Sequence, residues 1–115
     1  MATDEIDFIQ YVKPSDRVFV FTQSNEEYCV PGPLKYWLKA LQNSGCEFEQ
    51  VDRNIAVNLR NIKLLDKQYK LAYFEAKPGS NSKNCTISFG NFNKVLEKVL
   101  QINPSVIVTN QVGSL

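Results

Sequence analysis

The sequence predicts a three-layer α/β/α sandwich with a mostly parallel sheet of about five strands, of the Rossmann or flavodoxin kind. Two observations favour this fold class. Apolar runs that suit buried strands alternate along the chain with segments of helical periodicity. The run Val18 to Phe21 is apolar without interruption, which is typical of a strand covered on both faces. At 115 residues, the chain is expected to form a single α/β domain, residues 1–115.

The first half of the chain is predicted to alternate helices with strands. Thr3 can cap a helix that ends near Val12, because a proline follows shortly after it. The strand at Val18 to Phe21 comes next. The clearest helix then begins at Leu34, and its apolar side chains recur on one helix face, which places Trp37 in the core. After this helix, residues 47–51 alternate between polar and apolar side chains, as in a half-buried strand.

Residues 55–69 fit two interpretations. Alternate positions from residue 55 to residue 59 are apolar, as in a strand, whereas Leu59, Ile62 and Leu65 recur at helical spacing. A helix from about Ala56 to Lys67 is preferred, because two parallel strands need a crossover of about this length between them.

The last part of the chain is predicted to hold a hairpin and a crossover unit. Residues 71–75 and 85–89 suit two antiparallel strands, since the loop between them is too short for a helix. Asn91 can cap an amphipathic helix that stops near Asn103. Residues 105–109 form a compact apolar run, so the strand at 85–89, this helix and the last strand have the size of a parallel βαβ unit.

The composition excludes several classes of function. Thirteen Lys and Arg against twelve Asp and Glu give a net charge of +1, so nucleic acid is not indicated as a partner. The chain has no His, which removes imidazole-activated nucleophiles and most His-containing metal sites, and no cofactor or metal is expected. Neither of the two common glycine-rich phosphate loops is present.

The same reasoning bears on location. Three cysteines without a Cys-x-x-Cys pair indicate reduced thiols. The N-terminus lacks a basic region followed by an apolar signal segment, and no stretch approaches the roughly 18 to 20 apolar residues that a membrane span needs. We therefore expect a soluble, cytoplasmic protein that does not act at a membrane.

The candidate binding site is the polar loop that follows the strand at Val18 to Phe21. In the predicted architecture, ligands bind at the carboxyl ends of the strands, next to the N-terminus of the following helix. Asp52 ends the second predicted strand, where dinucleotide-binding folds place an acidic group for ribose. The candidate ligand- or partner-binding residues are Thr22, Gln23, Ser24, Asn25, Cys29 and Asp52.

An alternative fold comes from residues 26–29, Glu-Glu-Tyr-Cys, after the first predicted core strand. At Tyr28 and Cys29 this segment resembles the Cys-Pro-Tyr-Cys motif of glutaredoxins, which implies a thioredoxin-like fold. Glu26 stands where that family has its nucleophilic cysteine, which argues against dithiol exchange.

Because so much catalytic machinery is missing, the sequence favours a non-catalytic α/β module that binds another protein, as an accessory or regulatory domain. The alternative is a small protein that uses the loop from Thr22 to Cys29, either to bind a ligand such as a small anion or for thiol-dependent redox chemistry of a degenerate glutaredoxin-like kind.

Overall fold

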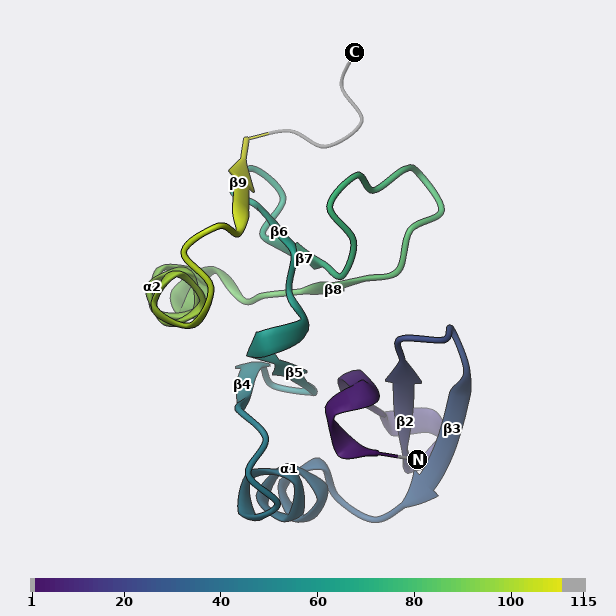
Figure 1. Ribbon diagram of the computed structural model, residues 1–115. Coiled ribbons are helices and arrows are strands. Elements are labelled where there is room, and N and C mark those ends of the chain that lie inside the picture. The colour runs from purple at the N-terminus through teal and green to yellow at the C-terminus, as the bar shows by residue number, and fades with distance from the viewer. Residues whose placement is uncertain (1, 111–115) are drawn as a thin grey trace.

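The computed structural model describes residues 2–110, which form two β-sheets and two α-helices (Figure 1). The first sheet has five strands in the order β3-β2-β1-β5-β4, and every neighbouring pair is antiparallel. Its strands are β1 (Ile6–Val12), β2 (Arg17–Thr22), β3 (Glu27–Pro31), β4 (Phe48–Asp52) and β5 (Ile55–Asn58).

The second sheet has four short strands in the order β8-β7-β6-β9, of which only β6 and β9 are parallel neighbours. Its strands are β6 (Leu64–Asp66), β7 (Leu71–Tyr73), β8 (Asn84–Thr86) and β9 (Ile107–Thr109). The helices are α1 (Leu34–Asn43) and α2 (Phe92–Ile102). Neither is long and apolar enough to cross a membrane, and no other helix occurs in residues 2–110 apart from short 3-10 turns.

This architecture contradicts the predicted fold class. The structure has two mostly antiparallel sheets, not one mostly parallel Rossmann- or flavodoxin-like sheet between helix layers, and the thioredoxin-like alternative does not describe it either. Two predicted helices are absent. The segment expected as a helix up to Val12 is a 3-10 turn followed by β1, and the helix expected at residues 56–67 is divided among β5, a 3-10 turn and β6.

The physical reason for both errors is burial on two faces. On β1, Phe8 belongs to one core and its neighbour Ile9 to the other; on β5, Val57 and Ala56 are divided in the same way. Strands of this kind carry apolar side chains at consecutive positions, so the alternation that marks a half-buried strand is lost.

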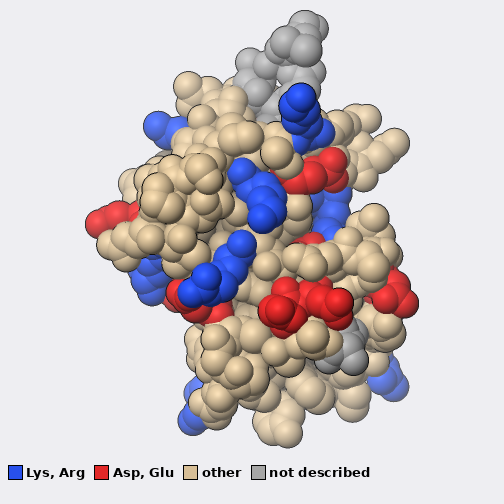
Figure 2. Space-filling model, in the orientation of Figure 1, with Lys and Arg blue, Asp and Glu red and all other residues tan. Residues whose placement is uncertain are grey.

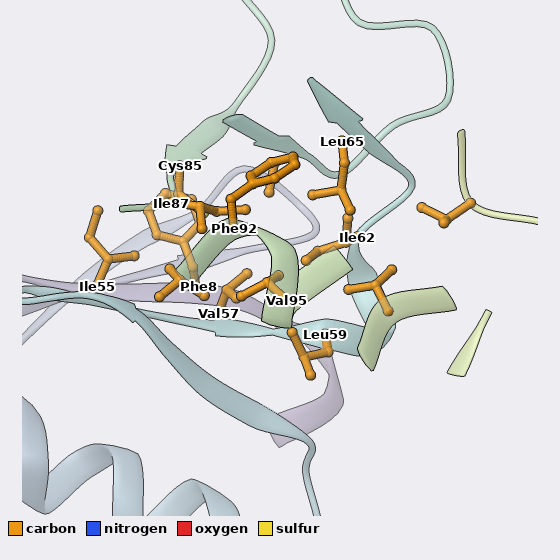
Figure 3. Close-up of a cluster of buried hydrophobic side chains, with 14 residues drawn as sticks. Phe8, Ile55, Val57, Leu59, Ile62, Leu65, Cys85, Ile87, Phe92 and Val95 are labelled. Atoms are coloured by element: carbon orange, nitrogen blue, oxygen red, sulfur yellow. The ribbon is translucent and has the colours of Figure 1, made fainter. Parts of the chain in front are cut away.

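The larger core lies between the five-stranded sheet, the second sheet and α2. Figure 3 shows side chains from all three parts converging, among them Phe8, Val57, Cys85 and Val95. The ring of Phe8 stacks on Phe21 with centroids 4.4 Å apart and on Phe74 at 5.6 Å. This core therefore joins the first and second sheets into one packed unit.

The smaller core lies on the opposite face of the five-stranded sheet, under α1. Leu34 and Leu41 of the helix pack with Ile9 and Ala56 of the sheet, which confirms the predicted apolar face of α1. Trp37 is not a core residue as predicted. It is half-buried at the edge of this cluster, and its Nε1 donates a hydrogen bond to the Pro31 carbonyl at 2.7 Å.

The prediction for the last part of the chain is confirmed in part. β7 and β8 form the expected antiparallel hairpin, and α2 begins at Phe92 as expected. However, β9 does not lie beside β8: it pairs with β6 at the edge of the sheet, with Leu64 opposite Ile107. Ile107 and Val108 are exposed, so this strand is not the fully buried element that its composition indicated.

Candidate functional site

The predicted binding loop is a tight turn between β2 and β3 and does not lead into a helix. Thr22 is buried in it: its Oγ1 accepts a hydrogen bond from Glu26 N at 3.1 Å, and its carbonyl accepts one from Asn25 N at 3.0 Å. Asn25 adopts a left-handed conformation with a φ of 63°. Thr22 therefore holds the turn together, while Gln23, Ser24 and Asn25 are exposed at its tip.

The other two candidate residues do not gather at this turn. Cys29 is exposed on β3, at the edge of the sheet. Asp52 ends β4, and across β5 it lies level with Gln10 of β1. The turn lies beside Ile6, at the beginning of β1. These two points are about 13 Å apart along the strand, at roughly 3.3 Å per residue. The six candidate residues therefore do not form one site.

The turn is instead tied to the long connection between β7 and β8 by Lys83. The Lys83 ammonium forms an ion pair with the buried Asp7 carboxylate, Nζ to Oδ2 at 2.5 Å. It also donates hydrogen bonds to the Thr22 carbonyl and, at 3.4 Å, to Asn25 Oδ1. The other oxygen of Asp7 accepts a hydrogen bond from Asn61 Nδ2 at 3.0 Å. No local sequence signal connects residues so far apart in the chain.

A depression of about 730 Å³ lies between this turn and residues 79–83. Its lining includes the carboxylates of Glu26 and Glu75 as well as the ammonium of Lys83, which is already paired with Asp7. Two carboxylates beside one neutralised cation do not suit a small anion, so the anionic ligand considered for this loop gains no support here.

The net charge of +1 conceals an uneven distribution. From residue 60 onward the sequence has eight Lys and Arg against three Asp and Glu, whereas residues 1–59 have five against nine. An asymmetry of this kind between two halves of a chain indicates interaction with nucleic acid or with a membrane, or a charged tail. The prediction from sequence missed it because only the total charge was considered.

Part of the positive excess of the second half is neutralised by intramolecular ion pairs. All four ion pairs of the described residues join a cation of the second half to a carboxylate of the first: Lys83 with Asp7, Arg60 with Glu47, and both Lys94 and Lys98 with Glu49. Figure 2 shows basic and acidic side chains meeting around the middle of the molecule. Burial raises the pKa of Glu49, but the hydrogen bonds and charges of Lys98 and Lys94 outweigh this and lower it.

Other cations have no carboxylate within 4.0 Å among residues 2–110. Three of them, Lys35, Lys39 and Arg53, line a depression of about 590 Å³ between α1 and the turn from β4 to β5. Amide side chains complete the polar part of the lining, and no carboxylate contributes to it. Uncompensated cations grouped with amides suit a polyanion such as a phosphate backbone.

The turn from β4 to β5 is joined to the second sheet by a series of hydrogen bonds through buried residues. The turn from β4 to β5 follows Val51, whose carbonyl accepts hydrogen bonds from Ser88 N at 2.8 Å and Asn91 Nδ2 at 3.4 Å. Next to Ser88, Ile87 N donates to the carbonyl of Lys70 at 2.8 Å, in the turn from β6 to β7. We use the name basic surface for five cations that have no carboxylate partner among the described residues and lie at the two ends of this series of hydrogen bonds: Lys35, Lys39, Arg53, Lys67 and Lys70.

Comparison with known proteins identifies the family. Residues 1–99 match the family model described as the LytTr DNA-binding domain. The chain belongs to the LytTR DNA-binding domain family. A solved structure of similar fold is the LytTr DNA-binding domain of a putative methyl-accepting/DNA response regulator from Bacillus cereus. It superposes with a TM-score of 0.61 and 14% sequence identity, over 87% of this chain and 84% of that chain. No curated protein matches the sequence.

Membership of the LytTR family overturns the predicted function and partners. A protein-interaction module of Rossmann-like fold was wrong, and so was the conclusion that nucleic acid is not indicated. The redox alternative was wrong as well. The structure offers no dithiol for it, since Cys29 is exposed on an edge strand while Cys85 is buried in the core of the LytTR domain.

Proposed function

We propose that this LytTR domain binds duplex DNA and that the basic surface contacts its phosphates. The observation that carries the proposal is the match of residues 1–99 to the family model. Support from this chain comes from Lys35, Lys39 and Arg53, whose charges have no carboxylate partner among the described residues and surround one depression. A cytoplasmic location is part of this proposal, since a DNA-binding domain must reach DNA.

The physical argument rests on where charge is left uncompensated. A cation that already pairs with a carboxylate gains less from a phosphate, because binding must first break the existing pair. Arg60, Lys94 and Lys98 are paired in this way, whereas the cations of the basic surface are not. Each unpaired cation that meets a phosphate releases counterions from the DNA, and this release favours binding at low salt.

Measurement of affinity against salt concentration tests the proposal. The wild-type domain should bind a duplex of about 25 base pairs, and the logarithm of its binding constant should fall linearly with the logarithm of salt concentration. In the double variant Lys39→Gln/Arg53→Gln, affinity should fall and the salt slope should decrease by about 2, or about 1 for each lost phosphate contact.

The chain offers a matched control. Arg60→Gln/Lys94→Gln also removes one Arg and one Lys, but from side chains that are paired with Glu47 and Glu49. Its salt slope should stay close to that of the wild type. Equal losses in both double variants would mean that only total charge matters, and the assignment of the basic surface would then be wrong.

The tip of the turn from β2 to β3 is a second proposed contact region, for base edges and not for phosphates, because the carboxylates of Glu26 and Glu75 lie beside it. Gln23 and Asn25 are exposed there, and amide side chains can both donate and accept hydrogen bonds at base edges. Ser24 is exposed beside them, but its hydroxyl donates to Glu26 Oε1 at 2.9 Å. Cys29, on β3, and Asp52, next to Arg53, have no role in this proposal.

A further inference from the structure

Phe89 is the most exposed of the large apolar side chains described in the structure, with 85% of its surface accessible. It begins the 3-10 turn Phe89–Asn91 that leads from the second sheet into α2. A phenyl ring in this position contributes little to the core, since its apolar surface remains in water.

A second exposed aromatic side chain and two cations lie on the turn that is hydrogen-bonded to this segment, and one of these cations is next to the Phe89 ring. Tyr69, which is 59% exposed, lies on the turn from β6 to β7 together with Lys67 and Lys70. This turn is hydrogen-bonded to the residue that precedes Ser88, through Ile87 N and the Lys70 carbonyl. Phe89 is therefore part of a group of neighbouring aromatic and basic residues rather than an isolated apolar side chain on the surface.

The ammonium of Lys70 is held next to the ring. Its Nζ is 5.3 Å from the ring centroid of Phe89 and 5.0 Å from that of the buried Phe92, and it donates a hydrogen bond to the Lys67 carbonyl at 2.5 Å. A cation at this distance interacts favourably with an aromatic face. The contact fixes a positive charge beside an exposed apolar surface at one end of the basic surface.

We propose that Phe89 enters a groove of the bound DNA and makes an apolar contact with base edges, with the C5 methyl group of thymine as its preferred partner. Lys70 and Lys67 then contact phosphates at the margin of the same groove. The inference rests on the proposed function and deepens it, because it assigns a base-reading residue to a surface otherwise built from phosphate-binding cations.

The Phe89 side chain suits contact with a base and not with a phosphate. A phenyl ring has no hydrogen-bond donor or charge for a phosphate oxygen, so it gains by leaving water only against apolar surface. In the major groove that surface includes the thymine methyl group, which Phe and other apolar side chains contact in protein–DNA complexes. The neighbouring cations favour a partner of negative charge, and this favours DNA over an apolar protein surface as the partner.

The experiment uses a duplex of about 25 base pairs, selected from a random pool by affinity for the wild-type domain. This length exceeds the 40 Å long axis of the domain at roughly 3.4 Å per base pair. Phe89→Ala should weaken binding by about tenfold to a hundredfold, as expected when a buried phenyl ring is lost from an interface. The salt slope should not change, because no charge is removed. Phe89→Leu should retain part of the affinity.

Replacement of thymine by deoxyuridine removes the methyl group alone. At one or two positions this replacement should weaken DNA binding by the wild-type domain. Binding by the Phe89→Ala variant should not change when the same positions are replaced. Lys67→Gln is the contrasting variant, since it should lower the salt slope by about 1 and keep the sensitivity to deoxyuridine. Thermal unfolding of all variants should resemble that of the wild type, because both side chains are exposed.

Three results would overturn the inference. Affinity of Phe89→Ala within about twofold of wild type would show that the ring does not enter the interface. Equal sensitivity of both proteins to deoxyuridine would assign the methyl contact to another residue. Self-association that Phe89→Ala abolishes, with unchanged DNA affinity, would make the ring a protein contact. If the wild-type domain binds no duplex at all, the proposed function and this inference are both wrong.

Discussion

Lys83 and Asp7 form an ion pair between the second sheet and the first, with Nζ and Oδ2 2.5 Å apart. The Asp7 side chain is 1% exposed and that of Lys83 is 17% exposed, so solvent screens this pair only weakly. Lys83 closes the long loop from β7 to β8, and Asp7 lies at the beginning of β1, beside the turn that Lys83 also contacts. The pair therefore connects three segments: the loop from β7 to β8, the beginning of β1 and the turn from β2 to β3.

Removal of this cation should destabilise the domain strongly. Lys83→Met leaves Asp7 as a buried charge with no cation beside it, at a cost of about 3–5 kcal/mol in the free energy of unfolding. Urea denaturation measures this loss. The double variant Asp7→Asn/Lys83→Met removes both charges and should recover a substantial part of it. A double variant no more stable than Lys83→Met would show that the hydrogen bonds of Lys83, and not the charge pair, stabilise the loop.

The tip of the turn from β2 to β3 should contribute to binding without contributing much to stability. Asn25 has a φ of 63°, so Ala would strain the backbone there, and Gly is the better replacement. We expect Gln23→Ala/Asn25→Gly to weaken DNA binding severalfold while the melting temperature changes by only a few degrees, a shift of about 1 kcal/mol or less. Unchanged affinity for the selected duplex would leave this turn with a structural role alone.

Stability should depend on pH through Glu49. Its pKa is lower in the folded protein than the ordinary value of 4.5, despite burial, because Lys98 and Lys94 bind the carboxylate at 3.0 and 3.2 Å. A lowered pKa means that the stabilisation is present above about pH 4.5 and is lost as the pH falls through the folded-state pKa.

Glu49→Gln should therefore lower stability at about pH 7, by about 1 kcal/mol or less because both lysines are substantially exposed, and should have little effect near pH 3. Urea denaturation across this pH range tests the expectation. Glu97→Gln, on α2, is the control, since Glu97 forms no ion pair in the part of the chain that the structure describes. A Glu49 effect that is constant with pH would exclude the two ion pairs as its cause.

The thiols should differ in reactivity with Ellman's reagent. Burial, and secondarily the charge of Asp7, raises the pKa of Cys85, so the reactive thiolate is scarce and the reagent has no access. Cys29 is exposed and should react first in the native protein. All three cysteines should react in denaturant. Fast labelling of Cys85 in native buffer would contradict its place in the core, and Cys29→Ser identifies the fast phase.

The sequence by itself determined those elements whose signal is local. α1 and α2 have one apolar face at helical spacing, and this pattern survives whatever the helix packs against. The hairpin of β7 and β8 follows from two short strands that are separated by a turn-rich loop. The charge asymmetry between the halves was equally present in the sequence, although it becomes visible only when the total is divided.

The tertiary structure decided the rest. β1 and β5 are strands because Phe8 and Val57 belong to the larger core while Ile9 and Ala56 belong to the smaller core under α1. No local pattern distinguishes such two-sided burial from a buried helix. Which cations remain available for DNA also depends on distant contacts, since Lys98 and Lys83 are neutralised by carboxylates far away in the sequence. Pairing between distant strands and charges is a property of the packed chain, because it depends on which segments meet when both faces of a sheet are covered.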